Sequence, residues 1–362
     1  MPAKRPNRYS ERRGNDWMGK VKRRGRPIRP RPDNAPSLED VARRAGTSII
    51  TVSRALRQPD KVRPETRARI TEAVEALGYI PNLAASSLVS RRSGIIAVVV
   101  PTLGNSTFVD TLHGLSDGVT AAGRQLLVGD TGYSEAAEHA LITALAGRRP
   151  DGIAIVGIVR NPRTRALLSN LGVPVVETWD MTDDPIDHVV GFSNTEAGRA
   201  MTRYLLDKGR RRIVFVGAHE PRSQAREAGY RSALQDAGLT GGATFFTDAP
   251  PSSFGEGRRL MHRIANLDPR PDAVFFSTDV LAVGGIIECQ HLGIEVPSDI
   301  AIAGLGDLEI GRSIVPALTT VQIPSYQMGR RAAEILSQRL EGAELTQKIV
   351  DFGVNIIARD SA

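Results

Sequence analysis

The sequence is nearly free of cysteine: Cys289 is the one thiol among 362 residues. A single cysteine excludes a disulfide framework and any zinc site built from several thiolates, and a lone thiol is typical of the reducing cytoplasm. No apolar run approaches the roughly 18 residues of a membrane-spanning helix. The basic N-terminal segment has no apolar stretch behind it, unlike a secretory signal. We therefore expect a cytoplasmic protein with no membrane partner.

A catalytic set is also lacking. The sequence has no Gly-Lys-Ser/Thr phosphate loop. No two histidines have a metal-binding spacing such as His-x-x-x-His; the six are His113, His139, His188, His219, His262 and His291. These absences predict that the protein is not an enzyme, and we expect no cofactor and no metal.

Positive charge is concentrated in the first quarter of the chain. Residues 1–36 carry 12 Lys/Arg against 3 Asp/Glu, and residues 37–93 carry 10 against 6. The remainder carries 25 against 31, so its net charge is −6. A basic end joined to a slightly acidic body is the charge pattern of a nucleic-acid-binding segment attached to another domain. The length predicts two or three domains.

Residues 1–36 are rich in Arg, Pro, Gly and Asn and hold almost no aliphatic side chains. Such a segment cannot bury enough apolar area to offset its ordering entropy, so we expect a disordered basic tail. Its stretch Arg23–Pro27 resembles an AT-hook core, which lays arginines in a narrow A·T minor groove. Composition favours a simpler alternative, a flexible tail that adds non-specific phosphate affinity.

Residues 37–82 have the pattern of a helix-turn-helix. Ser37 is a typical N-cap for a first helix, Gly46 permits a tight turn, and Ser48 can cap a second helix. A third helix is predicted from Pro64 to Gly78. Two short helices around a glycine-containing turn form the motif whose second helix enters the DNA major groove.

From Gly94 onward, short β-rich runs alternate with amphipathic stretches. Strand candidates are Ile95–Val100, Gln125–Gly129, Gly152–Val156, Val173–Glu177, Arg212–Gly217, Ala273–Ser277 and Ile300–Gly304. Helix candidates are Ser106–Ala122, Ser134–Ala146, Thr195–Lys208, Gln224–Ala237 and Asp279–Leu292. Two such sets in series predict two Rossmann-like α/β lobes with a ligand at the carboxyl ends of the strands. Leu318–Pro324 and Tyr326–Leu340 are expected to return to the first lobe.

Order and spacing in the first third of the chain resemble the LacI/GalR family of transcriptional regulators. The matching pieces are Asp40-Val41-Ala42, Ala45-Gly46, Thr51-Val52-Ser53-Arg54, Gly78-Tyr79-Ile80-Pro81-Asn82, Leu83–Leu88 and Ile95–Val100. The resemblance implies a helix-turn-helix domain at 37–82 and a hinge helix and linker at 83–93. It implies a periplasmic-binding-protein-like effector and dimerisation domain at 94–362, with crossovers near 193 and 320.

The resemblance also implies roles in DNA binding. Ile49 and Ile50 fall at the start of the recognition helix, where they cannot hydrogen-bond a base and are expected to contact thymine methyls. Arg54 is the candidate for a guanine contact. The residues expected to hold the DNA backbone or the recognition helix are Ser48, Thr51, Ser53, Arg67, Tyr79 and Asn82. Leu88 lies where the family inserts a leucine wedge into a base step; the alternative is an ordinary linker.

Effector-contacting candidates are expected in the loops beyond the strands: Phe108, Trp179, Thr278 and Asp307 follow predicted strands, Arg226 lies just before Gly229-Tyr230, and Phe254 precedes a predicted helix at Gly257–Ala265. Arg226 matches an arginine that the family places at the effector, although a surface salt bridge is an alternative. Trp179 and Phe254 are alternatively core residues. Many relatives have Asn in place of Thr278, and many have Asp one position before Asp307.

Several stretches, among them Pro101–Ser106 and Ala303–Glu309, resemble the gluconate-utilisation repressors of this family. The resemblance implies a homodimeric repressor that binds double-stranded operator DNA and a small sugar-type effector, first of all a sugar acid such as gluconate. The effector is expected to act as an inducer through lobe closure and hinge-helix unfolding. Alternatives are a neutral sugar, a keto-sugar acid, or a sugar-binding module without regulation.

Overall fold

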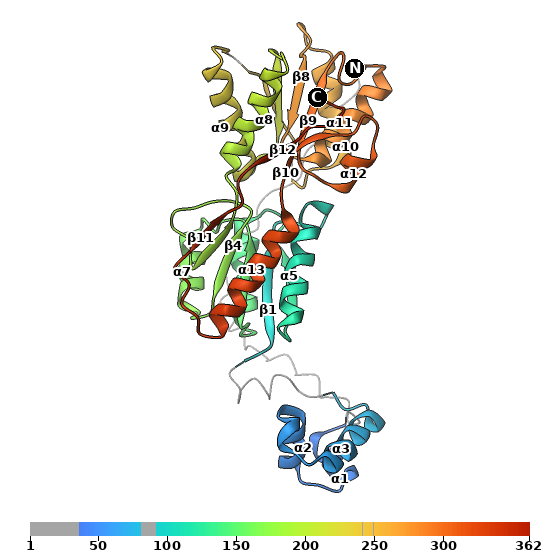
Figure 1. The fold of residues 1–362 in the computed structure, drawn as a ribbon, viewed down its shortest axis with the longest axis vertical. Helices are drawn as coiled ribbons and strands as arrows, with labels where there is room; N and C mark the ends of the chain where they lie inside the picture. Colours follow the sequence, from blue (N-terminus) through green and yellow to red (C-terminus); the bar gives the residue numbers. More distant parts are fainter. Residues whose placement is uncertain (1–35, 81–91, 241, 249) are drawn as a thin grey trace, which may run out of the picture. The chain divides into compact units, whose positions relative to one another are not determined.

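The structure is a computed structural model that describes residues 36–80, 92–240, 242–248 and 250–362 (Figure 1). The chain divides into two compact units, Met1–Asn82 and Leu83–Ala362. The predictions for the basic tail, for Asn82 and for the hinge residue Leu88 fall outside the described residues. No helix of the described parts is long and apolar enough to cross a membrane.

The first unit is a small helical domain. Its elements are α1 (Leu38–Arg44), α2 (Ile49–Arg57), the 3-10 turn η1 (Pro59–Lys61) and α3 (Pro64–Leu77). Ser37 begins α1 with a reciprocal cap: its Oγ accepts from the Asp40 N–H at 3.2 Å, and Asp40 Oδ2 accepts from the Ser37 N–H at 2.9 Å. Gly78 ends α3 with a left-handed φ of 61°. Val41, Val52 and Ile70 fill the core between the helices.

The second unit begins with a lobe built on a six-stranded parallel sheet of order β11-β5-β4-β3-β1-β2. Its strands are β1 (Ile95–Val100), β2 (Gln125–Asp130), β3 (Gly152–Val156), β4 (Val175–Thr178), β5 (His188–Gly191) and β11 (Ile349–Asp351). Its helical segments are η2 (Ser106–Phe108), α5 (Val109–Ala121), α6 (Glu135–Ala146), α7 (Pro162–Asn170) and α13 (Ser325–Leu340). We call this lobe 1.

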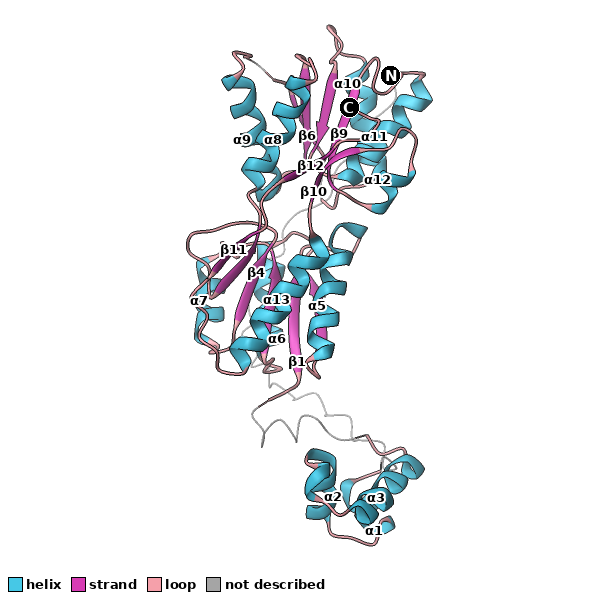
Figure 2. Cartoon of the chain, in the orientation of Figure 1, coloured by secondary structure: helices cyan, strands magenta, loops and turns pink. Residues whose placement is uncertain are grey.

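Lobe 2 repeats the arrangement with the order β12-β10-β9-β8-β6-β7, in which β12 alone runs antiparallel among the described strands. Its strands are β6 (Ile213–Gly217), β7 (Thr244–Phe246), β8 (Ala273–Phe276), β9 (Ala301–Gly306), β10 (Thr319–Gln322) and β12 (Asn355–Ile357). Its helices are α8 (Asn194–Asp207), α9 (Pro221–Asp236), α10 (Phe254–Ala265), α11 (Asp279–Leu292) and α12 (Glu309–Ser313). Helices pack against the sheet in each lobe (Figure 2).

The predicted fold class, an all-α helix-turn-helix domain followed by two Rossmann-like lobes, is confirmed. Within the described residues the chain passes between the lobes three times: from β5 to α8, from β10 to α13, and from β11 to β12. The third passage was not predicted, because β11 and β12 have three residues each, too few to show a strand period. Helix α9 begins at Pro221, three residues before the predicted start.

Glycines bring α8 and α9 into backbone contact. A Cβ at Gly198 of α8 would collide with the carbonyl of Arg226, and one at Gly229 of α9 would collide with the carbonyl of Thr195. This close approach places the Arg226 side chain beside the first turn of α8.

Candidate functional site

The first candidate surface is the exposed face of α2. Val52 and Ala55 of this helix are buried, whereas Ile50 is 70% and Ile49 is 46% exposed, and Arg54 is exposed. The two isoleucines are not needed for packing within the domain, because their side chains are exposed. They are therefore available for apolar contact with a partner. The structure therefore places the three predicted base-reading residues on one accessible helix.

Other predicted DNA contacts have different surroundings. Ser48 caps α2 by accepting from the Thr51 N–H at 3.2 Å, and its hydroxyl lies 2.8 Å from the Thr51 hydroxyl. Ser53 is partly exposed, and Arg67 is exposed beside Asp60. Tyr79 is 8% exposed and belongs to the core of this unit. Its ring therefore has a packing role that the sequence pattern did not reveal.

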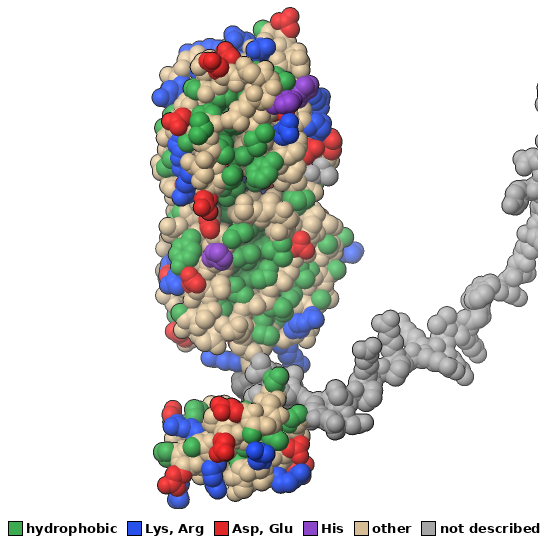
Figure 3. All heavy atoms as spheres, turned by 90° about the vertical axis from the view of Figure 1, so that its right-hand side faces the viewer, with side chains coloured by type: hydrophobic (Ala, Val, Ile, Leu, Met, Phe, Trp, Pro, Cys, Tyr) green, Lys and Arg blue, Asp and Glu red, His purple; other side chains and the backbone are tan. Residues whose placement is uncertain are grey.

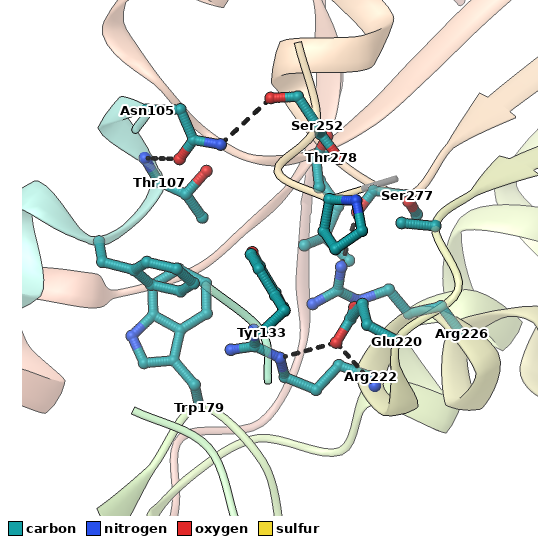
Figure 4. Close-up of a pocket in the computed structure, with 14 residues that line it drawn as sticks. Asn105, Thr107, Tyr133, Trp179, Glu220, Arg222, Arg226, Ser252, Ser277 and Thr278 are labelled. Atoms are coloured by element: carbon teal, nitrogen blue, oxygen red, sulfur yellow. Dashed lines mark hydrogen bonds and ion pairs between the residues drawn. The ribbon is translucent and has the colours of Figure 1, made fainter. Parts of the chain in front are cut away.

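The second candidate site is a pocket between the two lobes of the body (Figure 4). Lobe 1 contributes Asn105, Thr107, Phe108, Tyr133 and Trp179. Lobe 2 contributes chiefly Glu220, Arg222, Arg226, Ser252, Ser277 and Thr278. Most of these residues follow the carboxyl ends of parallel strands, which is where α/β sheets bind ligands.

Arg226 is buried in the wall of this pocket, and its guanidinium joins two elements. Its Nε donates to Asn194 Oδ1 at 2.8 Å and its Nη1 donates to the Ser277 carbonyl at 2.7 Å. Asn194 in turn donates to the Trp179 carbonyl at 3.0 Å and to Asp180 Oδ1 at 3.0 Å. Burial lowers the pKa of Arg226 to about 10, although Glu220 opposes this effect.

Arg222 and Glu220 form a buried ion pair at the start of α9. Glu220 caps the helix by accepting from the Ser223 N–H at 2.7 Å and the Arg222 N–H at 3.1 Å. Its Oε2 also accepts from Arg222 Nε at 3.3 Å. The Arg222 guanidinium lies 5.2 Å from the centre of the Phe108 ring, a cation–π contact. Figure 4 draws both arginine side chains toward the centre of the pocket.

The pKa shifts of this pair reflect burial opposed by charge. Burial alone raises the pKa of Glu220, but Arg222 and Arg226 outweigh it, and the net pKa is lowered. Burial likewise lowers the pKa of Arg222, and the negative charge of Glu220 more than compensates, so the net pKa is raised. Both groups are therefore ionised at neutral pH.

Trp179 and Phe108 form the apolar wall of the pocket. Their rings meet edge to face with centroids 4.9 Å apart, and the Trp179 indole N–H donates to Thr111 Oγ1 at 2.8 Å. Trp179 has a φ of 68° and Tyr133 a φ of 61°, a backbone region that is costly for large side chains. Such strain concentrates at functional sites.

The structure does not bring all predicted effector residues together. Thr278 lines the pocket while capping α11. Phe254 does not line it: it is 44% exposed on the first turn of α10, and Ser252 reaches the pocket in its place. Asp307 does not line it either, because its carboxylate is held by Arg312 at 2.8 Å and by Arg359 and Gln322.

Sequence reasoning missed Tyr133, Glu220, Arg222, Asn105 and Ser252. One usable signal was the pair Glu220-Pro221, an acidic N-cap before a proline at the first helical position, which would have started α9 early enough to include Arg222. No group of His, Cys, Asp and Glu among the described residues could hold a metal ion.

Known families match both parts of the chain. A model described as bacterial regulatory proteins of the lacI family matches residues 37–82, and a periplasmic binding protein-like domain matches residues 202–362. The HTH-type transcriptional regulator GntR of Pseudomonas aeruginosa is 36% identical over 332 residues, which cover 91% of this chain and 97% of that protein. The chain belongs to the LacI family.

Solved structures agree with this assignment. A LacI-family transcriptional regulator from Silicibacter pomeroyi is 32% identical, with a TM-score of 0.84 over 90% of this chain and 99% of that chain. Transcription regulator GntR from Chromobacterium violaceum is 38% identical, with a TM-score of 0.71 over 74% of this chain and 98% of that chain. This LacI-family protein is a DNA-binding transcriptional regulator and not an enzyme.

Proposed function

We propose that this LacI-family regulator is a cytoplasmic homodimeric repressor that leaves its operator when a sugar acid such as gluconate binds between the lobes. The observation that carries the effector class is the charge of the pocket. Its described lining holds Arg222 and Arg226 against a single acidic residue, Glu220, a net charge of +1. A buried net charge is costly unless it is paired. One carboxylate neutralises this lining, whereas a neutral sugar adds no charge to it.

Polar atoms without a partner support a hydroxyl-rich ligand. Among the described residues, Ser277 Oγ and Arg222 Nη1 are buried without a hydrogen bond, and both residues line this pocket. Unsatisfied buried polar groups are rare and call for a specific reason. Phe108 and Trp179 offer apolar ring surface on the opposite side, which suits the carbon face of a sugar.

The effector acts by changing the arrangement of the two lobes. The cavity volume is only about 30 Å³, enough for a water or two, and Asn105 Nδ2 donates to the Ser252 carbonyl at 3.2 Å between the lobes. A sugar acid needs more space, so it binds an arrangement of lobes or side chains different from this one. A ligand that prefers one arrangement shifts the population toward it. We propose that the shift reaches the segment 83–93 and unfolds its hinge helix.

Exposed apolar side chains support the homodimer. Helices α5, α10, α11 and α12 lie on the side of the body that faces the viewer in Figure 3, where hydrophobic side chains gather across both lobes. Exposed residues of these helices are Val109, Phe254, Ile287, Leu292 and Ile310. A broad apolar patch of this kind marks an interaction surface, and a second copy would supply the two helix-turn-helix units that a pseudo-palindromic site needs.

The test is fluorescence anisotropy at fixed salt, with labelled DNA from the region upstream of this gene and a scrambled DNA of equal length. We expect tight binding to the upstream DNA alone, and release by gluconate. Specific binding that gluconate does not change would contradict the effector and favour a neutral sugar or a keto-sugar acid. Specific binding that no sugar-type ligand changes would contradict a sugar-type effector altogether.

A further inference from the structure

We propose that Arg222, and not Arg226, is the residue that binds the carboxylate of the effector. The inference rests on the proposed function, because it assumes that an anionic sugar derivative enters this pocket. The two buried arginines then have different roles. Arg222 recognises the anion, and Arg226 is a positioning residue that holds the wall of the pocket.

Arg222 has hydrogen-bonding capacity left over. The side chain is 8% exposed, its Nη1 is buried without a hydrogen bond, and Tyr133 lies beside the guanidinium. Its one carboxylate contact within the described protein uses Nε, which donates to Glu220 Oε2. The planar guanidinium can therefore keep Glu220 on one edge while it donates to a second carboxylate from another. The Phe108 ring under the guanidinium holds its plane in place.

Arg226 uses two of its five N–H donors to hold neighbouring elements together. Nε is bound to Asn194 and Nη1 to the Ser277 carbonyl, both at distances below 2.9 Å. These bonds connect α9 to the first turn of α8 and to the end of β8. A ligand carboxylate that took either donor would leave a buried acceptor unpaired, which is costly. The geometry therefore favours a structural role for Arg226, which holds α9 against α8 and β8.

Arg222 also lies between the inner pocket and a second hollow. Arg222, Glu220 and Tyr133 line the inner pocket and, on their other side, a second hollow of about 300 Å³. That hollow also carries Arg160, Glu135 and Glu138. Glu220 competes with the ligand carboxylate for the Arg222 guanidinium, because it already accepts a hydrogen bond from Arg222 Nε.

The experiment compares gluconate with sorbitol, which has a neutral CH₂OH group in place of the carboxylate. Isothermal titration calorimetry on the full chain gives the ratio of the two dissociation constants for the wild type and for each variant. For Arg222→Gln we expect gluconate binding to weaken by about 10- to 100-fold, as for a lost charge-assisted hydrogen bond, with sorbitol binding nearly unchanged. Arg226→Gln is expected to weaken both ligands together and to lower the Tm.

Two further variants sharpen the assignment. Glu220→Gln removes the competing carboxylate, so we expect tighter gluconate binding relative to sorbitol. Arg231→Gln is the matched control: Arg231 lies on the same helix, is half-exposed, and pairs with Glu227 outside the pocket. The ratio should not change in this control.

The inference is overturned if Arg222→Gln keeps the wild-type ratio of gluconate to sorbitol affinity, or if Arg226→Gln is the variant that abolishes it. Should Arg222→Gln fail to fold, Arg222→Lys decides, because an ammonium cannot reproduce the fork geometry; an unchanged ratio in that variant overturns the inference equally. A wild type without any preference for gluconate contradicts the proposed effector itself, which is a separate result.

Discussion

The two candidate sites present their functional side chains in opposite ways. On α2, Ile50 and Arg54 stand in solvent, and the helix is held by other residues, such as Val52, on its inner face. In the pocket between the lobes, Trp179, Arg222 and Arg226 are all buried, and each is bonded to the framework that it belongs to. Recognition and stability are separable on the surface helix and are coupled in the pocket.

The difference has a physical origin. A DNA groove brings its own hydration and phosphate charge to an exposed helix, so the protein can leave those side chains unpaired until binding. A small ligand must be enclosed, and enclosure desolvates every charge around it. The pocket therefore needs internal partners such as Asn194 and Glu220 that keep its arginines satisfied.

The largest effect is expected at Trp179. Trp179→Ala removes a buried ring that contacts Phe108 and donates to Thr111, so the free energy of unfolding of the body should fall by about 3–5 kcal/mol. Urea unfolding followed by circular dichroism measures this loss. A loss below about 1 kcal/mol would mean that the pocket wall is not part of the core, and the contrast between the two sites would fail.

The next effect concerns Asp279, which is fully buried and accepts from the Thr320 hydroxyl at 2.6 Å and the Leu308 N–H at 2.8 Å. Burial raises its pKa from 3.8 to about 6. A raised carboxyl pKa favours folding when the group is protonated, so this contribution is fully present below pH 3.8 and is lost as pH rises through about 6. The loss is on the order of 3 kcal/mol.

The free energy of unfolding of the wild type and of Asp279→Asn, measured by urea unfolding between about pH 4 and pH 7, checks this shift. The wild type should lose stability relative to the variant over that interval, since the amide does not titrate. Parallel pH profiles for the two proteins would show that the carboxyl has its ordinary pKa.

A smaller effect is expected at Ile50, and on DNA affinity alone. Ile50→Ala should weaken specific operator binding by about 1 kcal/mol, or roughly fivefold, through lost contact with a thymine methyl. The free energy of unfolding should change by less than about 0.5 kcal/mol, because the side chain is exposed. Anisotropy with specific and scrambled DNA separates the two effects. Equal losses on both DNAs would remove Ile50 from base reading.

The smallest effect is expected at Ser37. Ser37→Ala breaks the reciprocal cap with Asp40 and should destabilise the first unit by roughly 0.5–1 kcal/mol. Hydrogen exchange of the α1 amides measures it locally, and Ser37→Thr, which retains the hydroxyl, is the control. Unchanged exchange in Ser37→Ala would show that the cap is not needed for α1.

Periodicity and turn chemistry predicted most of the fold. The cap at Ser37, the left-handed Gly78, and buried strands such as β3 follow from local rules that tertiary packing does not override. Strands of three residues, such as β11, carry no such pattern, and their pairing is decided by neighbours distant in the sequence.

The pocket was less predictable, because the packing of the lobes and the direction of each side chain decide which residues line it. Arg226 was identified through the family resemblance, whereas Arg222, four residues earlier, was missed although both belong to α9. Phe254 was expected in the pocket as an aromatic residue ahead of a helix at Gly257–Ala265, but α10 begins at Phe254 itself and leaves its side chain outside. No local sequence pattern shows that Arg222 and Arg226 line the pocket and that Phe254 does not. The outcome depends on which side chains in the first turns of α9 and α10 point toward the other lobe.

The decisive measurement is the release of the wild-type protein from its operator by gluconate and by sorbitol, titrated side by side at one salt concentration, which must be fixed because phosphate contacts make affinity salt-dependent. A pocket of net positive charge predicts that gluconate releases the DNA at a concentration at least tenfold below that of sorbitol. Equal release midpoints, or release by sorbitol alone, would contradict a regulator whose effector is recognised by its carboxylate.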